Sequence, residues 1–450
     1  MKRIALAIFL VFLGFAISPA QAVRLAQNEA AQVAIVPLFN TLGGMDTLLK
    51  VSNGPAYSAV RVQLRSSDGQ RIEAFNIYLA PNEAWGAALT ERPDGAVMTN
   101  TDPTCILGIG GTSAVNPLQT EIPLSSAFGY IEILLMGHVE DPDVQFEISS
   151  RSCEALAGRF AAGPWEIDGN NGVVAPSNAL QLLAQLINVE RGTLYGLESV
   201  HLAEFRDLPF HVPPAQQFGL SDVHDQGTLQ GETSSLVCDG TCETKTWVDR
   251  RDAVASLFLA VARSAEYGVN PAIGASSSFV ILNPMHPYYA DGEFPDHETG
   301  LFVTDSDFGI LNFCFSPQPP PTSPLDICPR PIRLEDPEAL SSFSIPSSGS
   351  SSPVTAPLPI LGIPGLYPDA ESSTIADRFI SGTFRILFLT FDNPSLISND
   401  QSEFFGLPSI VLGFTEYQNG ELFSPEFGAV RANYGTSALG IKIETNPGDL

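Results

Sequence analysis

Apolar and polar residues alternate in short stretches through the first part of the chain. In residues 58–66, Val60, Val62 and Leu64 are separated by small or polar residues, which is the period of a half-buried strand. The Asp68-Gly69 pair that follows indicates a hairpin turn, because glycine accepts the positive φ of a tight turn. The pattern predicts strands at residues 34–40, 47–53, 58–66, 71–80, 128–139 and 144–150.

Short strands at this spacing favour immunoglobulin-like sandwiches. The chain has 450 residues, more than one core usually holds, which favours two domains. The loose sequence at residues 163–174, GPWEIDGNNGVV, marks the expected boundary. We predict a mainly β protein of two immunoglobulin-like or related β-sandwich domains, with one crossover or lid helix and long loops. The predicted parts are a signal peptide (1–22), an N-terminal β-sandwich domain (23–163) and a second β-rich domain (164–450).

The second part of the chain contains one predicted helix, near residues 250–267. Asp249 or Asp252 can cap its start and Gly268 can stop it. Its apolar residues recur at steps of three and four, which places them on one face. They are Val254, Leu257, Phe258, Val261 and Ala265. Such a stripe favours packing on a sheet over binding to a partner.

Strands and one long excursion are predicted for the rest of the second part. Residues 180–189 and 193–200 favour a hairpin over a helix, because Gly192 lies between them and β-rich sequence follows. Further strands are predicted at residues 278–282, 308–315, 382–391, 409–423 and 438–444, with Asn419-Gly420 as a hairpin turn. Residues 316–369 are rich in proline and serine, which disfavours a regular ladder and indicates a surface excursion.

The N-terminus has the three-part pattern of a secretory signal. Lys2 and Arg3 precede the apolar run Ile4–Ile17, and a small-residue cleavage site ends at Ala22. The alternative, a membrane anchor, needs a run of about 20 apolar residues, and this one is shorter. A lipoprotein is disfavoured because no cysteine lies at the cleavage point. We therefore expect export to the periplasm, the cell surface or the medium, with no transmembrane segment in the mature chain.

The charge balance excludes one class of partner. The formal net charge is -28 and the sequence pI is near 4.4. Such a field repels nucleic acid and anionic lipid, keeps an exported protein soluble and attracts cations. We therefore expect no nucleic-acid partner. Other components of the cell surface or matrix, and further copies of this chain, remain open as partners.

Six cysteines in an exported chain indicate disulfides. The pairing with the shortest loops is Cys105–Cys153, Cys238–Cys242 and Cys314–Cys328, one of fifteen possible pairings. A zinc site at Cys238 and Cys242 is the alternative. It is disfavoured because no second Cys or His pair lies near at a suitable spacing.

Several longer phrases resemble a known group of proteins. They are NTLGGMDTLLKVSN, FNIYLAPNEAW, FGYIEILLMG, INVERGTLYGLESV, NPAIGASSSFVILNP and FTEYQNGELFSPEFGAVRANYG. Together they resemble secreted proteins of similar length from Gram-negative bacteria, a family without an established activity. The resemblance touches both halves of the chain and implies export and an all-β structure. It carries over no catalytic or binding residue.

The densest group of reactive side chains lies between Asn270 and Asp307. Calcium accepts many oxygen ligands in flexible geometry, and this loop supplies six carboxylates. They are Asp291, Glu293, Asp296, Glu298, Asp305 and Asp307. Their spacing departs from that of an EF-hand, in which acids alternate around a glycine at the sixth position. The sequence predicts a calcium site here, with a solvated acidic loop as the simpler alternative.

Catalysis has weaker support in the sequence. A serine hydrolase usually places its nucleophile in G-x-S-x-G, and the chain contains no such sequence. His286 and His297 lie eleven residues apart among the acids, but H-E-x-x-H is absent. Paired carboxylates with Trp85, Trp165 and Trp247 would also suit glycoside hydrolysis, although each tryptophan fits a core position equally well.

Two functions therefore remain, and the first is favoured. One is a non-catalytic structural, adhesive or binding protein of the bacterial cell exterior. The alternative is a secreted hydrolase or metal-dependent enzyme that uses the loop 286–307. The first predicts extended neutral surfaces, whereas the second predicts a concave pocket that gathers His286 or His297 with acids.

Overall fold

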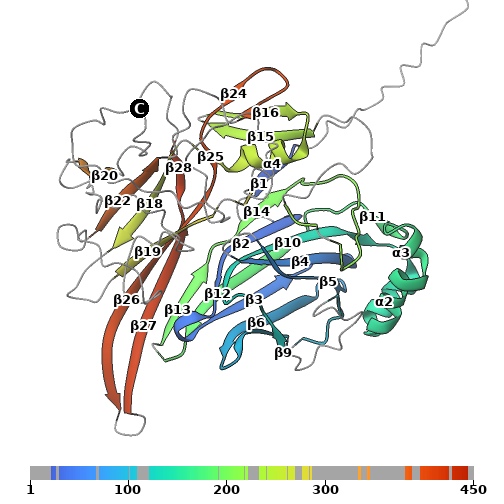
Figure 1. Ribbon diagram of the computed structural model, residues 1–450, viewed down its shortest axis with the longest axis horizontal. Coiled ribbons are helices and arrows are strands. Elements are labelled where there is room, and N and C mark those ends of the chain that lie inside the picture. The colour runs from blue at the N-terminus through green and yellow to red at the C-terminus, as the bar shows by residue number, and fades with distance from the viewer. Residues whose placement is uncertain are drawn as a thin grey trace, which may run out of the picture.

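The computed structural model describes residues 22–26, 30–66, 70–100, 102–108, 121–190, 192–216, 218–220, 233–239, 241–260, 262–268, 276–282, 284–285, 333–335, 342–344, 381–387, 396–424 and 428–443. The described residues are mainly β (Figure 1). Strands form several antiparallel sheets, and four short α-helices accompany them. The predicted β class is thus confirmed.

Two antiparallel sheets, here called the N-terminal sheet pair, account for most of residues 22–203. The eight-stranded sheet contains, in spatial order, β1 (Arg24–Ala26), β14 (Val200–Ala203), β2 (Val33–Asn40), β10 (Phe128–Val139), β4 (Ser58–Ser66), β5 (Arg71–Leu79) and β8 (Ile106–Leu107), with β11 (Val173–Val174) beside β10. The six-stranded sheet contains β13 (Thr193–Leu197), β12 (Gln181–Asn188), β3 (Met45–Ser52), β6 (Ala84–Arg92), β7 (Gly95–Asn100) and β9 (Glu121–Pro123).

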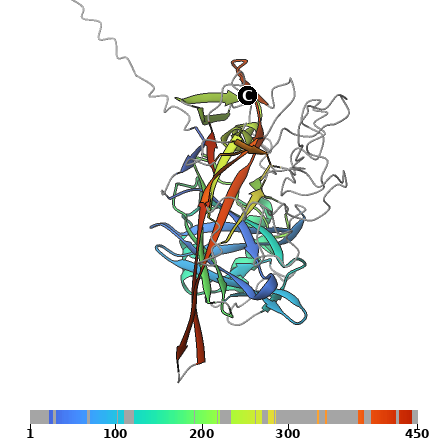
Figure 2. The same cartoon turned by 90° about the vertical axis from the view of Figure 1, so that its left-hand side faces the viewer.

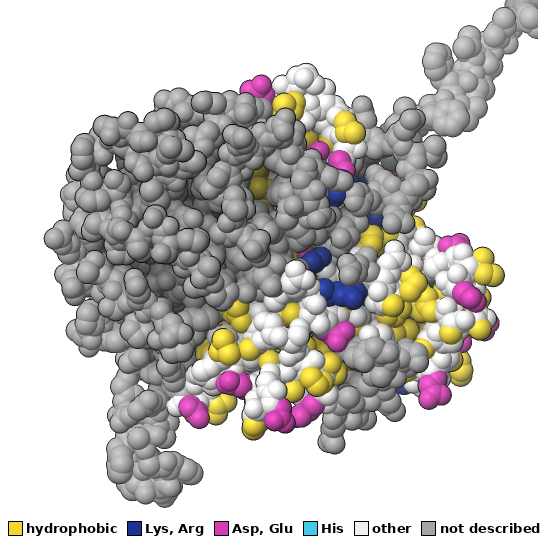
Figure 3. Space-filling view, in the orientation of Figure 1, with side chains coloured by type: hydrophobic (Ala, Val, Ile, Leu, Met, Phe, Trp, Pro, Cys, Tyr) yellow, Lys and Arg dark blue, Asp and Glu magenta, His cyan; other side chains and the backbone are white. Residues whose placement is uncertain are grey.

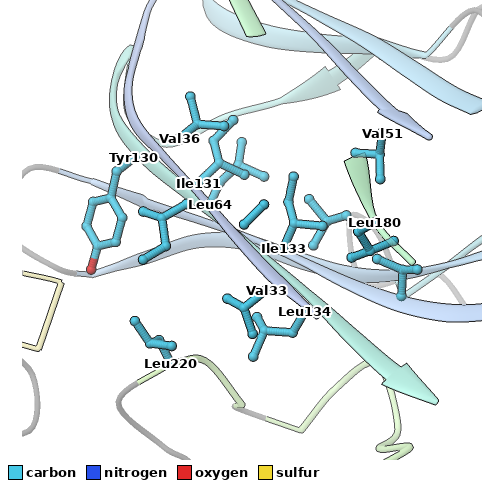
Figure 4. Packing of buried hydrophobic residues seen from close by; sticks show 14 of the residues in the cluster. Val33, Val36, Val51, Leu64, Tyr130, Ile131, Ile133, Leu134, Leu180 and Leu220 are labelled. Carbon is cyan, nitrogen blue, oxygen red and sulfur yellow. The ribbon is translucent and has the colours of Figure 1, made fainter. Parts of the chain in front are cut away.

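The inner faces of the two sheets pack against each other. Val36 of β2 and Ile131 of β10 pair in register and lie in one core cluster with Val51 of β3 (Figure 4). Phe75 of β5 and Trp85 of β6 meet edge to face, with ring centroids 5.7 Å apart. Burial of these apolar side chains is the main favourable term in the stability of the sheet pair.

The two sheets differ on their other faces. In β3 and β6, buried and more exposed residues alternate, so this part of the six-stranded sheet has one open face, whereas Val97 of β7 on the same face is buried. Every residue of β2 and β10 is buried, so the eight-stranded sheet is covered on both sides. Part of its outer cover is residues 205–216 and 218–220, here called the cover segment, which contributes buried Phe205, Phe210 and Leu220.

Strands on both sides of the expected boundary at 163–174 belong to these two sheets. β12 pairs with β3 over Gln181–Asn188, and β14 pairs with β2. The predicted hairpin at 180–200 is present as β12 and β13. The segment 163–174 contains the short helix α3 (Pro164–Ile167) and β11, which pairs with β10. Sheet pairing therefore continues past the loose sequence that marked the boundary.

One predicted strand is wrong. Residues 144–149 lie in α1 (Pro142–Ser149), Ser150 is its C-cap, and α2 (Cys153–Ala162) follows after a short connection. The Asp141 side chain accepts hydrogen bonds from the amides of Asp143 and Val144, and Pro142 occupies the first turn, where its missing N–H costs nothing. These start signals outweigh the β-rich composition of VQFEISS.

The described strands after residue 220 form smaller sheets. Five strands follow the order β21 (Ser342–Ser344), β20 (Arg333–Glu335), β22 (Ser381–Leu387), β18 (Ala262–Gly268) and β28 (Ile441–Ile443). Two-stranded sheets are β15 (Thr233–Asp239) with β16 (Thr241–Trp247), β17 (Leu259–Ala260) with β25 (Leu407–Pro408), and β23 (Leu396–Ile397) with β24 (Glu403–Phe404). β20 and β21 lie within residues 316–369, for which no ladder was expected.

The predicted helix near 250–267 is only half as long. α4 spans Arg250–Phe258 and is capped by Asp249, as expected. All residues from Ala253 to Phe258 are buried, so α4 has no solvent-facing stripe there. Leu259 is already extended, and the next residues pair as β17 and β18. Pairing with β25, β22 and β28 replaces the second half of the predicted helix.

A long two-stranded ribbon, here called the ribbon, projects from the body. β26 (Ile410–Ser424) pairs with β27 (Gly428–Leu439) from Leu412 opposite Leu439 to Ser424 opposite Gly428. β19 (Ser276–Leu282), the strand predicted at 278–282, pairs with the base of β26. The predicted turn at Asn419-Gly420 is wrong, since these residues lie within β26 at an irregularity in the register. The hairpin reverses further on, between Ser424 and Gly428.

The structure contains the Cys105–Cys153 and Cys238–Cys242 disulfides that the shortest-loop pairing predicts. The Cα atoms are 5.2 and 4.0 Å apart. The second disulfide links Cys238 of β15 to Cys242 of β16, which lie directly opposite each other one pair before the end of the hairpin ladder. This bond takes the place of the alternative zinc site. Cys314–Cys328, the strand 308–315 and the signal peptide lie outside the described residues, except for Ala22.

Candidate interaction surfaces

The calcium ligands proposed from the sequence all lie outside the described residues, as do His286 and His297. The calcium site therefore stays a prediction. Within the described ranges, no group of three or more His, Cys, Asp or Glu side chains is placed to hold a metal ion. The described residues form several other clusters of polar side chains and two surfaces that are candidates for interaction.

A layer of polar side chains lies between the eight-stranded sheet and the cover segment. Arg61 of β4 donates to the carbonyls of Pro214 (2.9 Å) and Gln216 (2.6 Å). Asn76 of β5 donates to the carbonyl of Val212 at 2.9 Å. Buried backbone carbonyls need such donors. These bonds fix the cover segment to the sheet.

An ion pair extends this layer. Arg65 Nε lies 3.3 Å from Glu132 Oε1, and Glu132 Oε2 accepts from the Leu220 amide at 3.0 Å. A Cβ at Gly219 would collide with Glu132 Oε2 and Arg65 Nη2, so a larger residue here would displace the two charged side chains. Since the two charged side chains are 8% and 0% exposed, the pair is closed to ligands and fixes the end of the cover segment.

An aromatic cluster surrounds a buried histidine. His211 Nδ1 donates to the Gly169 carbonyl at 2.6 Å, which leaves Nε2 to accept from the Tyr78 hydroxyl at 2.8 Å. The Trp165 ring lies edge-on to His211, with centroids 4.5 Å apart. Desolvation lowers the pKa of His211 to about 4 and raises that of Tyr78. Both groups are neutral at pH 7 and serve the core.

His138 and Ser177 form one of two pairs among the described residues that resemble a nucleophile with its base; in the other, Ser199 Oγ lies 2.9 Å from His201 Nε2. Ser177 is exposed, and its Oγ lies 2.8 Å from His138 Nε2. His138 Nδ1 lies 3.0 Å from Ser58 Oγ, which donates to Asn53 Oδ1 at 2.8 Å. Desolvation lowers the pKa of His138, so the ring is neutral at pH 7, as a general base requires.

Two details favour a structural role for this histidine. The Ser177 amide also donates to His138 Nε2, at 3.0 Å, so the hydroxyl shares that lone pair with its own backbone. The partner of Nδ1 is a neutral hydroxyl, whereas the usual orienting group is a carboxylate that stabilises the imidazolium. The hydrogen bonds thus connect β4 and β10 to the segment that enters β12.

The open face of the six-stranded sheet, here called the outer face, is the first candidate surface. Its apolar members include Leu48 at the centre of β3, with Leu183 and Leu194 53% and 45% exposed. Alternation and register place further small residues there, Gly86 and Ala88 of β6. These residues share one face of the sheet, and exposed apolar patches mark interaction sites more often than isolated apolar residues do.

The charges on the outer face balance. The positions of its six strands that face outward hold two acidic residues and two basic residues. They are Asp46, Glu121, Lys50 and Arg92. Arg92 and Glu121 form an exposed ion pair with an N–O distance of 2.8 Å. Partial burial raises the pKa of Asp46, an effect that the positive charge of Arg92 opposes. Figure 3 shows acidic side chains scattered over the described part of the visible surface, with some Lys and Arg side chains among them.

The ribbon is the second candidate surface. Both views show it extending past the body of the molecule (Figures 1 and 2). Among the described strands, residues 417–424 of β26 pair only with β27, so the outer edge of this part of β26 has no strand beside it. Exposed strand edges offer free backbone donors and acceptors to another chain.

The base of the ribbon is attached to the N-terminal sheet pair. The Glu198 amide donates to Ser437 Oγ, and the Leu439 amide donates to Glu198 Oε2 at 2.9 Å. A Cβ at Gly435 would collide with the ring of Tyr195, so a glycine is needed where β27 crosses β13. This attachment gives the projecting end a firm support.

Sequence reasoning missed both surfaces. The alternation of residues 45–52 contains the signal for the outer face, but which strands flank β3 depends on long-range pairing. No helix of the described ranges is long and apolar enough to span a membrane. No protein-family model matches the chain, and neither the curated proteins nor the solved structures contain a detectable match.

Proposed function

We propose that the protein is an exported, non-catalytic structural or adhesive component of the bacterial cell exterior, located in the periplasm, at the surface or outside the cell. The observation that carries this proposal is the projecting ribbon with its firmly attached base. An arm of this kind suits contact with a second macromolecule at a distance from the body. The two disulfides suit an oxidising compartment outside the cytoplasm.

The fold supports the same function by analogy alone. We propose that the N-terminal sheet pair is a β-sandwich related to immunoglobulin-like domains, which serve contact functions in many proteins. Fold analogy carries little weight for function. The predicted calcium site would add rigidity to the loop 291–307 without implying catalysis.

The test is to shorten the ribbon without disturbing its base. Gln418 lies opposite Asn433, so replacing residues 419–432 with Asn-Gly would close the hairpin early with a favoured two-residue turn. In a strain that lacks the protein, we expect this variant to be exported and folded but to leave attachment to surfaces or matrix unrestored. Cell fractionation and adhesion assays measure the two properties.

The control variant replaces only residues 425–427 with Asn-Gly, which keeps the paired length of the ribbon. It should restore attachment to the level of the unmodified protein. Equal restoration by both variants would contradict a role for the ribbon. A deletion strain with normal attachment and normal envelope would contradict the proposal as a whole.

A secreted hydrolase is the second candidate, because Ser177 and His138 lie at hydrogen-bond distance. The purified protein would then turn over esters, peptides or glycans. Loss of that turnover in His138→Ala would assign it to this pair, and loss in His286→Ala would assign it to the loop 286–307. Turnover that either substitution abolishes would replace the adhesive proposal.

A further inference from the structure

The outer face is nearly symmetrical about Leu48. Leu48 lies midway along β3, with Gln185 of β12 on one side and Ala88 of β6 on the other. Asp46 and Lys50 lie two residues before and two residues after it on the same face. On β12, Ile187 lies level with Asp46 and Leu183 level with Lys50.

The charge of the whole chain restricts what can cover this face. Two molecules that each carry a formal net charge of -28 repel each other over most of their surfaces. The outer face, with two acidic and two basic positions, is a surface where they can approach without that repulsion. Its small residues Gly86 and Ala88 also permit close approach.

We propose that the outer face binds the same face of a second copy of this chain, forming a dimer with twofold symmetry. In such an isologous interface, if one residue contacts another, the reverse contact also forms. The twofold axis lies in the plane between the two faces and passes over Leu48 at right angles to β3. The two β3 strands are then antiparallel. The axis sets Asp46 of each copy opposite Lys50 of the other.

The same axis matches the apolar residues. β12 then faces β12 of the second copy, so Leu183 lies over Ile187, and Ile187 over Leu183. Ala88 lies over its own counterpart, where only a small side chain is needed. One symmetry operation therefore satisfies the charged pair and the apolar pair together, which is the complementarity that a specific interface requires.

The proposed dimer uses the outer face and not the ribbon, so a test of dimerisation is independent of the function proposed for the ribbon. The experiment uses the full mature chain in sedimentation velocity over a range of concentrations. The unmodified protein should form dimers in a concentration-dependent equilibrium. Asp46→Lys and Lys50→Asp each set like charges opposite each other, and each should weaken dimerisation by about tenfold or more.

Two rescue measurements decide the register. The double variant Asp46→Lys/Lys50→Asp restores opposite charges across the axis and should dimerise to within about threefold of the unmodified protein. An equimolar mixture of the two single variants should form mixed dimers, since one chain then carries lysine at both positions and the other carries aspartate at both. Asp207→Lys, an exposed matched charge change outside the outer face, should leave the equilibrium unchanged.

A protein that stays monomeric at every concentration reached would overturn the proposal. Dimerisation that neither single variant weakens would also overturn it, because the interface would then lie elsewhere. Failure of both rescues would overturn the proposed axis. Thermal unfolding of each variant by circular dichroism confirms that loss of dimers reflects the interface and not the fold.

Discussion

The two buried histidines among the described residues, His138 and His211, are hydrogen-bonding parts of the core. His211 shows this most clearly, because each ring nitrogen has one partner of the matching type, the Gly169 carbonyl and the Tyr78 hydroxyl. A protonated ring would place an N–H where the hydroxyl now donates, and it would bury a charge beside Trp165. The same cause, desolvation, lowers the pKa of both His211 and His138.

The lowered pKa of His211 predicts that the folded chain loses stability in mild acid. The pKa of His211 is about 4 in the folded chain and about 6.5 in the unfolded chain, so the unfolded chain binds the proton first as the pH falls. The contribution of neutral His211 to the free energy of unfolding is fully present above about pH 6.5 and is lost between about pH 6.5 and 4. The folded state should lose about 3 kcal/mol over that window from this group, since each pKa unit corresponds to about 1.4 kcal/mol.

The measurement is urea unfolding at several pH values for the unmodified protein and His211→Gln. The variant should be less stable at pH 7.5, because glutamine replaces a well-packed ring. The difference between the two proteins should then narrow as the pH falls towards 4, since only the unmodified protein has this group to titrate. A difference that stays constant with pH would show that His211 does not govern the acid response.

At the scale of single elements, strands with strict alternation could be predicted from the sequence and irregular features could not. β4 and β5 lie within a residue of their predicted bounds, because the sequence of β4 alternates and the Asp68-Gly69 signal separates the two strands, although every residue of β4 except Ser66 is buried in the structure. The sequence prediction missed α1 although the helix has two start signals, the cap Asp141 and Pro142 in the first turn. There the composition of VQFEISS was given more weight than the cap.

Strand pairing explains the two other errors, with distant strands in one case and within the β26–β27 hairpin in the other. The three- and four-residue spacing in 250–267 is real, but Leu259–Gly268 gains sheet partners from residues more than 100 positions away. Asn419-Gly420 has the composition of a hairpin turn and is absorbed as an irregularity within β26. A local signal decides structure only where no strand pairing competes for the same backbone.

The two disulfides present in the structure should differ in their effect on stability. Cys105–Cys153 closes a loop with a sequence separation of 48, and Cys238–Cys242 one with a separation of 4. Loop-closure entropy in the unfolded chain then gives about 4 kcal/mol for the first and about 2 kcal/mol for the second. The paired alanine variants Cys105→Ala/Cys153→Ala and Cys238→Ala/Cys242→Ala, compared by urea unfolding, measure both values.

The outcome that contradicts this expectation is an equal loss for both pairs, or a larger loss for the short loop. Either would mean that effects other than chain entropy decide the two losses, because the burial of Cys105 can only add to the loss for the longer loop. Peptide mapping without reduction of the same samples would also show whether Cys314 and Cys328 form the third predicted disulfide.

At the scale of the whole molecule, one core runs through parts of the chain that sequence length suggested were separate. The same cluster of buried side chains includes Trp85 of the sheet pair, Trp247 beside α4 and Phe414 of β26. Tyr195 of β13 meets Phe414 edge to face, with ring centroids 6.0 Å apart. The sequence does not reveal such contacts, because they join residues that come close only after both sheets have formed.

A shared core should make the described parts unfold together. Trp85 and Trp165 report on the N-terminal sheet pair and Trp247 on the β15–β16 hairpin, and all three are at most 2% exposed. Trp247→Phe leaves fluorescence from the sheet pair alone, whereas Trp85→Phe/Trp165→Phe leaves fluorescence from the hairpin alone. In each variant, the fluorescence transition in urea should coincide with the transition in far-ultraviolet circular dichroism, as expected for one cooperative unit.

Comparing two signals within each variant removes the effect of the substitution on stability itself. If the hairpin signal changed at a lower urea concentration than the circular dichroism, the parts would be independent domains, and the contacts of Tyr195 and Phe414 would be too weak to couple them.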